Sequence, residues 1–570
     1  MKKLFALAVM FIATTGFIQA QFTRYIVQLT DKKGTPYSFT APSAYLSDKA
    51  IARRTKYHIS IDSTDLPPTP AYLDSIRKVP NVSILNISKW LNQVLIKIAD
   101  TNAVATALTR INSFSFVKKT SPLAPRISTI ANRSGVIEDD VTAVSSPGNQ
   151  RQMGVTGTED LNYGKTYDQI HIHEGEYLHN LGYNGKGMTI AIIDAGFYMY
   201  LTNPVFDSVR LQGRVLGTWD YVNNEASVNE DYIHGAYVFS VLASNRPGVM
   251  VGSAPYASYW LLKTEDTNSE YPVEEQNWIA AAEFADSAGV DMISTSLGYA
   301  DFDKAAFSYS YAQRDGHTAM ISIAADMAVK KGILVVVAAG NSGGTSTDAK
   351  YVGCPADADS VLTVGAVDKF GNIGGFSSWG PNGAGLLKPN VVSVGVSTVI
   401  ATTAGNAGSG TGTSYACPNM AGLVACLWQA FPDFTNMEIM NAVQQSSSKY
   451  SSPDFRFGYG IPNFRIAYGL LQTLREARTK EAILGDKWIK AYPVPFNNGF
   501  KVVLKAPATG RASLQLTNIV GQTIETREMD VQEGELYIID YQSMRGLAKG
   551  VYYIRYTQGS NKQTLSLLRR

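Results

Sequence analysis

Three residues of the sequence carry the side chains that acyl transfer requires. Asp194 follows an apolar run that predicts a β-strand, His234 begins an apolar helical pattern, and Ser414 lies in a glycine-rich turn before another helix. A serine hydroxyl is a weak nucleophile, so it needs a base within hydrogen-bond reach, and a histidine base needs a carboxylate that fixes its tautomer. The three side chains could therefore serve as nucleophile, general base and orienting acid.

Each of these residues also has a simpler structural interpretation. An Asp after a strand is commonly a turn residue or a helix cap, a His at a helix start can cap or pack, and a Gly-Thr-Ser turn is an ordinary N-cap. Taken together, however, the residues stand in the order Asp, His, Ser, which differs from the orders in chymotrypsin and in the α/β-hydrolases. This order favours the catalytic interpretation.

Five short motifs around these residues carry a resemblance to a known family. They are Ala191-Ile-Ile-Asp194-Ala-Gly196, His234-Gly235, Ser296-Leu297-Gly298, Ala338-Ala-Gly-Asn341 and Gly412-Thr-Ser414-Tyr-Ala-Cys-Pro418. In content and order they resemble the subtilisin-like (subtilase) serine proteases. The resemblance implies that Ser414 is the nucleophile, that His234 is the general base and then the general acid, and that Asp194 orients the histidine.

The same resemblance implies an oxyanion donor and a substrate-binding segment. Asn341 follows an apolar strand, from which its amide could point into a cleft and donate to a developing oxyanion. The alternative for Asn341 is a simple turn residue. Ser296, Leu297 and Gly298 resemble the edge along which subtilases pair the backbone of a substrate.

Two other residues could be considered as nucleophiles. Ser342 lies in a Gly-Asn-Ser-Gly-Gly run that resembles a chymotrypsin motif, but that class is all-β, which the strand–helix alternation here contradicts. Cys417 has no His near it in sequence. Because Cys354, Cys417 and Cys426 are odd in number, at least one is unpaired within the chain, and we expect all three to pack as small apolar side chains.

The sequence departs from the family pattern at two positions near the triad. Many subtilases have a second His where this chain has Tyr237, and a His where it has Asn419. Both positions lie outside the triad, so they could tune the cleft but do not argue for inactivity.

A possible metal site lies before the first apolar strand. His171, His173 and Glu174 are close in sequence, and a His-x-His pair can bind a metal. No further ligand is identifiable, so we expect no metal there and interpret the cluster as a surface segment. The resemblance implies no cofactor for the chemistry and allows structural calcium, with ligands unknown.

The elements around the motifs predict an α/β fold for residues 166–475. Apolar runs alternate with helical patterns, which include 275–288 and 316–331. The runs are 188–193, 259–262, 291–294, 333–337 and 361–364. Apolar strands that alternate with helices predict a subtilisin-like parallel sheet with helices on both faces, and function in such sheets gathers beyond the carboxyl ends of the strands.

The N-terminal third predicts export and a separate domain. Residues 1–20 have the positive start, apolar run and small final residue of a signal peptide, and the apolar run is too short for a comfortable transmembrane anchor. Residues 21–120 predict a small α+β domain in the place of a subtilase propeptide, or alternatively a permanent accessory domain. Residues 121–165 predict an exposed linker that could hold the maturation cleavage site.

The last residues, 490–570, predict a small β-sandwich of short alternating strands. The carrying features are Ala491-Tyr492-Pro493-Val494-Pro495-Phe496, Asn518-Ile-Val-Gly521-Gln522, Leu547-Ala-Lys-Gly-Val-Tyr-Tyr-Ile554 and the basic ending Arg569-Arg570. They resemble the C-terminal sorting domain of type IX secretion, and the alternative is a generic binding module.

Composition excludes one class of partner. The 570 residues contain 50 Lys and Arg against 48 Asp and Glu, a net charge of +2, so no surplus exists to neutralise the phosphates of a nucleic acid. The subtilase resemblance and the predicted signal peptide together imply a secreted or cell-surface serine endopeptidase made as a zymogen. Its expected partners are protein or peptide substrates, its own propeptide as an intramolecular inhibitor, and the secretion machinery. The competing hypothesis is a non-catalytic adhesin or scaffold on a subtilase fold.

Overall fold

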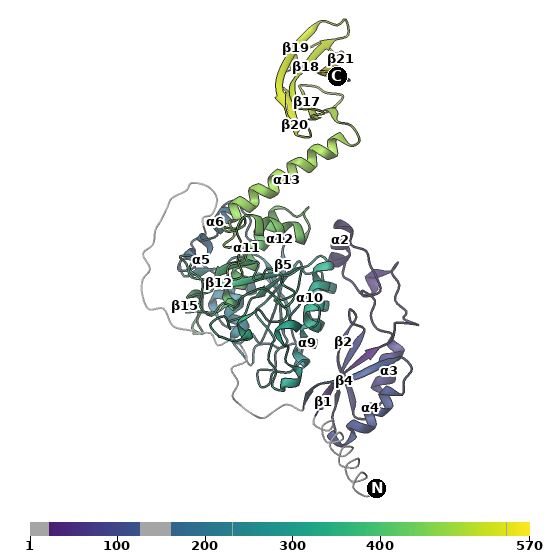
Figure 1. Ribbon diagram of the computed structural model, residues 1–570, viewed down its shortest axis with the longest axis vertical. Helices are drawn as coiled ribbons and strands as arrows, with labels where there is room; N and C mark the ends of the chain where they lie inside the picture. Colours follow the sequence, from purple (N-terminus) through teal and green to yellow (C-terminus); the bar gives the residue numbers. More distant parts are fainter. Residues whose placement is uncertain (1–21, 126–160, 231, 543) are drawn as a thin grey trace. The chain divides into compact units, whose positions relative to one another are not determined.

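The computed structural model describes residues 22–125, 161–230, 232–542 and 544–570 (Figure 1). The predicted signal peptide and most of the predicted linker lie outside these residues. The chain divides into two compact units, with the boundary between Tyr468 and Gly469. Within the described ranges, no helix has the length and apolar character needed to cross a membrane.

An N-terminal domain, residues 22–125, is built on a four-stranded antiparallel sheet in the order β2-β3-β1-β4. Its strands are β1 (Phe22–Leu29), β2 (Val82–Ser88), β3 (Gln93–Ile98) and β4 (Val117–Pro125). Helices α3 (Pro70–Arg77) and α4 (Val104–Asn112) cover one face and bury the alternate apolar residues of the strands (Figure 1). The domain is thus the predicted α+β fold.

The N-terminal domain continues beyond the sequence-based boundary at residue 120, because β4 runs to Pro125. Pro122 and Pro125 argue against a strand at these positions, since proline has no N–H to donate to a neighbouring strand. β4 is an edge strand, however, where proline is tolerated. A further arm between β1 and α3 carries helix α2 (Asp48–Lys56).

The central domain contains a seven-stranded sheet in the order β13-β12-β11-β10-β5-β9-β6, with every neighbouring pair parallel. The strands are β5 (Thr189–Asp194), β6 (Val215–Asp220), β9 (Ser258–Lys263), β10 (Met292–Thr295), β11 (Leu334–Ala338), β12 (Leu362–Val367) and β13 (Val391–Val394). The sequence had predicted five of them; β6 and β13 form the two edges. The chain leaves β5 toward β9 and β6 and later returns on the other side at β10, so Asp194 ends the strand at the switch point of the sheet.

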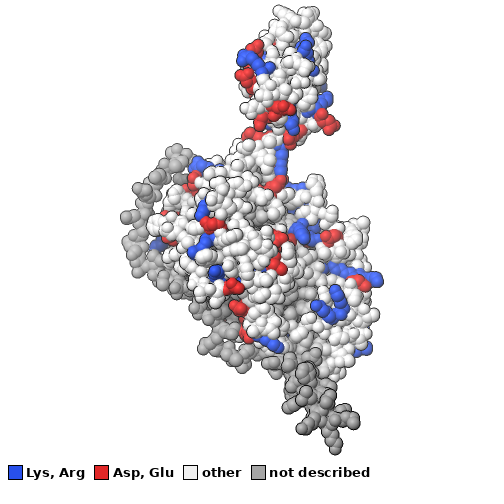
Figure 2. Space-filling model, viewed as in Figure 1, with Lys and Arg blue, Asp and Glu red and all other residues white. Residues whose placement is uncertain are grey.

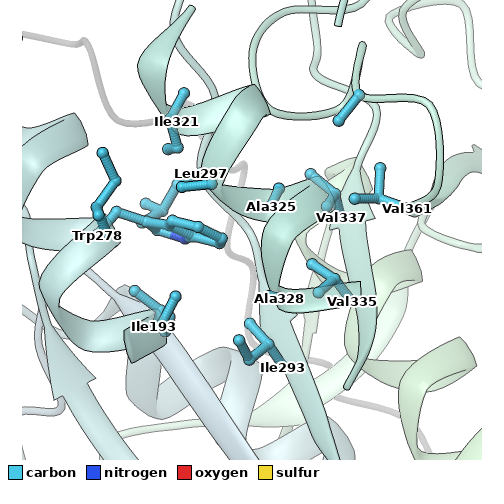
Figure 3. Packing of buried hydrophobic residues seen from close by; sticks show 14 of the residues in the cluster. Ile193, Trp278, Ile293, Leu297, Ile321, Ala325, Ala328, Val335, Val337 and Val361 are labelled. Atoms are coloured by element: carbon cyan, nitrogen blue, oxygen red, sulfur yellow. The ribbon is translucent and has the colours of Figure 1, made fainter. Parts of the chain in front are cut away.

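Helices cover both faces of this sheet, as predicted. Helices α9 (Val273–Ala288) and α10 (Met320–Lys330) pack on one face around Trp278, which lies among apolar residues of β5, β10 and β11 (Figure 3). Helices α8 (His234–Ala243) and α11 (Thr413–Ala430) pack on the other. The second layer carries His234 and Ser414 at the first turns of its two helices.

The open face of the N-terminal sheet lies against the start of α9. Gln93 donates to Gln276 at 2.7 Å, and Asn86 exchanges hydrogen bonds with Gln276 and Asn277. Apolar residues of β1, β3 and β4 also pack with Val273. The central domain therefore buries the second face of the N-terminal sheet, whose first face is covered by α3 and α4.

The C-terminal unit is a β-sandwich, as the alternating pattern predicted. Sheets β16-β17-β20 and β19-β18-β21-β22 face each other across one apolar cluster. The strands are β16 (Ile489–Tyr492), β17 (Phe500–Lys505), β18 (Gly510–Asn518), β19 (Thr523–Val531), β20 (Leu536–Tyr541), β21 (Gly550–Gln558) and β22 (Asn561–Arg569). Helix α13 (Phe464–Leu484) precedes them and continues past residue 475, where the sequence placed the end of the catalytic region.

On the face shown in Figure 2, Lys and Arg are mixed with Asp and Glu, and much of the surface is uncharged. This mixture agrees with the net charge of +2. The face offers no continuous basic surface of the kind that follows a phosphate backbone.

Candidate active site

Asp194 and His234 form a buried hydrogen-bonded pair. Asp194 ends the apolar strand β5 and is fully buried, and its Oδ1 lies 2.7 Å from His234 Nδ1 and accepts the Ala195 N–H at 2.7 Å. A carboxylate only accepts hydrogen bonds, so Nδ1 of His234 carries the proton. This arrangement leaves Nε2 of the neutral ring as the basic nitrogen.

Gly235 allows the helix that carries His234 to approach β5. A Cβ at position 235 would lie 2.5 Å from the carbonyl oxygen of Gly196 and 3.1 Å from Cβ of Asp194. Any larger residue would push the first turn of α8 away from the strand. The His-Gly motif therefore has a local physical reason: the glycine sets the distance that the Asp194–His234 bond needs.

Ser414 lies in the first turn of α11, next to this pair. Its neighbour Tyr415 has its ring centroid 6.3 Å from that of His234. The Ser414 side chain is fully buried, and its Oγ makes no hydrogen bond to any residue in the described parts of the chain. The first backbone N–H groups of a helix have no intrahelical partner and favour negative charge. Ser414 thus combines a hydroxyl that has no structural bond with a backbone donor suited to an anion.

Pro418 and Ser296 shape the turn that carries Ser414. A proline inside a helix removes the N–H that would bond the carbonyl four residues earlier, which here is the carbonyl of Ser414. The hydroxyl of Ser296 donates to that carbonyl at 2.9 Å. The side chain of Ser296 therefore satisfies the acceptor that Pro418 leaves open.

Asn341 lies beside the first turn of α11, where hydrogen bonds fix the oxygen of its side-chain amide. Its Oδ1 accepts the backbone N–H and the hydroxyl of Thr413, both at 2.9 Å. The Thr413 hydroxyl in turn accepts the N–H of Gly340 at 3.1 Å. Because Thr413 holds the oxygen, the amide NH2 of Asn341 is the end available to another acceptor. The structure thus brings Asp194, His234, Ser414 and Asn341 to one edge of the sheet.

The central domain matches the subtilase family over residues 185–460. Subtilisin of Bacillus pumilus is 31% identical over 288 residues, which is 50% of this chain and 92% of that protein. The chain belongs to the subtilase family. Subtilisin E of Bacillus subtilis is also 31% identical over 288 residues, but the match spans 66% of that protein, just under two thirds. Serine protease AprX of Bacillus subtilis is 29% identical over 300 residues, 47% of this chain and 63% of that protein.

The flanking domains of this subtilase match two further models. Residues 24–135 match the peptidase S8 propeptide domain of Bacteroidota, and residues 490–568 match a secretion system C-terminal sorting domain. The sorting domain directs the chain through type IX secretion to the cell surface or the extracellular space. These matches agree with the two resemblances that the sequence motifs had suggested.

The substrate segment of the subtilase motif is more buried than its predicted role suggests. Ser296 and Leu297 are 1% and 5% exposed, and Leu297 belongs to the apolar cluster around Trp278 (Figure 3). Gly298 is exposed, and Tyr299 beside it pairs with Cys354 through two backbone hydrogen bonds. Of the three residues, Gly298 is therefore the one whose backbone a substrate could reach directly.

The cysteines pack as small side chains, as predicted. Cys354, Cys417 and Cys426 are all unpaired and buried. Cys417 lies against the carbonyl oxygens of Thr295 and Val336, and burial raises the pKa of its thiol to about 12. These two carbonyl oxygens hold the thiol within the core, which argues against Cys417 as an alternative to Ser414.

The side chains of the His171–Glu174 cluster bond separate partners. His171 bonds Glu176, whereas His173 bonds the carbonyl of Pro462 and the hydroxyl of Ser393. His173 is fully buried, which lowers its pKa to about 4, so the interpretation as a surface segment is wrong for this residue. Across the described ranges, no group of three or more His, Cys, Asp or Glu is arranged to hold a metal.

The two departures from the family pattern have structural roles. Tyr237 packs with Tyr415 in a small apolar cluster behind the triad. Asn419 is buried and donates to the carbonyl of Gln169 and to the hydroxyl of Ser393.

An acidic segment lies beside the candidate triad, and the sequence motifs did not assign it a role. Thr264, Glu265 and Asp266 follow β9, and the N–H of Thr264 donates to the carbonyl oxygen of Asp194 at 3.1 Å. Glu265 accepts the hydroxyl of Tyr299 at 2.5 Å, and burial raises its pKa to about 7. The position of this segment in the sequence could have indicated its place near Asp194. It follows the predicted strand β9, and in a parallel sheet the carboxyl ends of β9 and β5 lie at the same edge.

Proposed function

We propose that this subtilase is a secreted serine endopeptidase, made as a zymogen, that hydrolyses peptide bonds through a Ser414 acyl-enzyme. The observation that carries the proposal is the 2.7 Å bond between Asp194 Oδ1 and His234 Nδ1 beside the first turn of α11. It supplies a base of fixed tautomer next to the Ser414 hydroxyl, which has no hydrogen bond to the residues that the structure describes. The resemblance to subtilisins supports the same roles.

In the first half of the reaction, Oγ of Ser414 attacks the substrate carbonyl while its proton moves to Nε2 of His234. The carbonyl oxygen becomes negative and accepts the N–H of Ser414 and the amide of Asn341. Asp194 stabilises the imidazolium. When the carbon–nitrogen bond breaks, His234 returns the proton to the leaving amine, and the acyl group remains on Ser414.

In the second half, water replaces the amine. His234 takes a proton from water as its oxygen attacks the acyl carbon, and the same two donors hold the oxyanion. Collapse releases the carboxylic acid, and the proton returns to Oγ of Ser414. Each step uses only side chains, backbone donors and water, and none requires a cofactor.

The N-terminal domain acts on this site as an intramolecular inhibitor until maturation. Its sheet already packs on α9, and its last strand, β4, ends at Pro125 with Leu123 and Ala124 packed beside Val273. The linker that follows would carry the maturation cut. Secretion through the sorting domain would deliver the zymogen to protein or peptide substrates outside the cell.

The test is hydrolysis of casein by the matured wild-type protein and by Ser414→Ala. We expect the variant to lose activity and to accumulate as the uncut precursor. Equal casein hydrolysis by both proteins would overturn the assignment. A non-catalytic scaffold predicts no hydrolysis by either protein.

A further inference from the structure

A guanidinium from the N-terminal domain occupies an acidic site on the central domain. Arg24 of β1 and Asp266 are 7% and 6% exposed, and Nη1 of Arg24 lies 3.9 Å from Oδ2 of Asp266. That oxygen has no hydrogen-bond partner in the parts of the chain that the structure describes. The two charges therefore face each other without the short hydrogen bond of a tight ion pair.

This site belongs to the same edge of the sheet as the triad. Thr264, two residues before Asp266, donates its N–H to the carbonyl oxygen of Asp194. Glu265 accepts the hydroxyl of Tyr299, which follows the exposed Gly298. Asp266 therefore lies on the loop that flanks the segment expected to pair with the substrate backbone.

The surroundings of Asp266 strengthen its attraction for a cation. Glu274 is 1% exposed, and its carboxylate oxygens accept the N–H groups of Asp266 and Tyr271 at 2.8 and 3.1 Å. Burial, followed by the charges of Glu270 and Glu265, raises the pKa of Glu274 well above its ordinary value. Acidic groups this close together disfavour one another's ionisation, and a positive charge relieves that cost.

Arg24 is a temporary partner in this arrangement. It belongs to the N-terminal domain, which the proposed maturation removes, whereas Asp266, Glu274 and Glu265 stay with the central domain. When Arg24 leaves, the site loses the guanidinium that compensates it, and leaving a charge without its partner in a partly buried site is unfavourable. The vacated position matches the size and charge of another Lys or Arg side chain.

We propose that Asp266 is a specificity-determining residue that binds a Lys or Arg side chain of the substrate, on the N-terminal side of the scissile bond, in the position that Arg24 fills in the precursor. The inference rests on the proposed endopeptidase function. Glu274 holds the loop of Asp266 in place through the N–H of Asp266. The competing interpretation is that the pair only anchors the N-terminal domain.

The test compares matured wild type with Asp266→Asn on peptide pairs that carry Lys or its uncharged analogue norleucine at each position before the cleaved bond. We expect wild type to favour Lys at one position by about tenfold or more in kcat/KM. Asp266→Asn should reduce that ratio to about one while it cleaves the norleucine peptide within about threefold of wild type. Asp301→Asn, an exposed loop residue that loses the same charge, should keep the wild-type ratio.

Two results would overturn the proposal: a wild type without Lys preference at any position, or an Asp266→Asn enzyme with the wild-type ratio. The second would show that Asp266 serves only as the anchor for Arg24. Should Asp266→Asn not mature, wild type alone decides, since the Lys preference should fall as salt rises from about 0.05 to about 1 M. Failure of the proposed function itself is a separate result, namely no cleavage of any peptide and no labelling of Ser414 by a fluorophosphonate.

Discussion

The hydroxyl of Ser296 donates a hydrogen bond of 2.9 Å to the carbonyl oxygen of Ser414. That carbonyl lacks its helical partner because position 418 is proline. The two residues come from different strand–helix units, and the bond ties the end of β10 to the turn that carries the candidate nucleophile. The family motif around Ser296 thus has a structural role besides the substrate contact expected of it.

This relationship predicts a dependence between positions 296 and 418. In the inactive Ser414→Ala precursor, Ser296→Ala should lower the free energy of unfolding by about 1–3 kcal/mol, because it leaves a buried carbonyl without a donor. In a Pro418→Ala background, the restored N–H can bond the carbonyl of residue 414, so the same substitution should cost less than about 1 kcal/mol. Urea unfolding of the four precursors measures the difference, and an equal cost in both backgrounds would contradict the account.

Asn341→Ala should lower kcat strongly and leave KM nearly unchanged, since the proposed role of its amide is to donate to the developing oxyanion. One such donor is worth about 10²–10³ in kcat, a magnitude that was measured in subtilisin itself. Thr413→Val removes one of the two bonds to Oδ1 and should reduce kcat less, whereas Thr413→Ser should have almost no effect. Steady-state kinetics of the matured enzymes tests this, and a fall of less than about threefold for Asn341→Ala would count against its role.

Sequence motifs point to these candidate residues because acyl-transfer chemistry restricts residue type at such positions. Asp194, His234, Ser414 and Asn341 meet at one edge of the sheet, as their motifs suggested. Ser296 shows the limit of such reasoning. Its motif marked it as a substrate contact, but its hydrogen bond depends on a helix more than a hundred positions later, which no local pattern reveals.

The fold was predictable where the apolar pattern was strong. The five inner strands of the central sheet read as continuous apolar runs because both of their faces are buried. The edge strand β6 was missed because it is less buried and carries Gly217, Thr218 and Asp220. The burial of His173 was also missed, since its partners, Pro462 and Ser393, lie far away in the chain.

Glu275 predicts a pH dependence of stability. It is fully buried, which raises its pKa from 4.5 to about 8. The folded chain therefore keeps a proton that the unfolded chain loses, so this contribution to stability is full below about pH 4.5 and is lost as the pH rises to about 8. Relative to Ser414→Ala alone, the added substitution Glu275→Gln should become more favourable between about pH 5 and about pH 8, by on the order of 1–3 kcal/mol. Urea unfolding at the two pH values measures this, and a constant difference would refute it.

The three cysteines should be inert in the folded protein. All are buried, and burial raises the pKa of Cys417 to about 12 and of Cys354 well above its ordinary value. A thiol-reactive dye should label none of them in the native precursor and all of them after unfolding. Alkylation under native conditions should leave proteolysis unchanged. Rapid labelling of a native cysteine, or inhibition by the reagent, would show that the packing described here is wrong.

Active-site labelling tests the central claim most directly. The matured protein is treated with a fluorophosphonate, and mass spectrometry of the digest locates the modified residue. The account predicts a single modified serine, Ser414, and labelling that His234→Ala reduces by several orders of magnitude because the base is lost. Modification of Ser342 instead, or labelling of Ser414 that does not depend on His234, would contradict it.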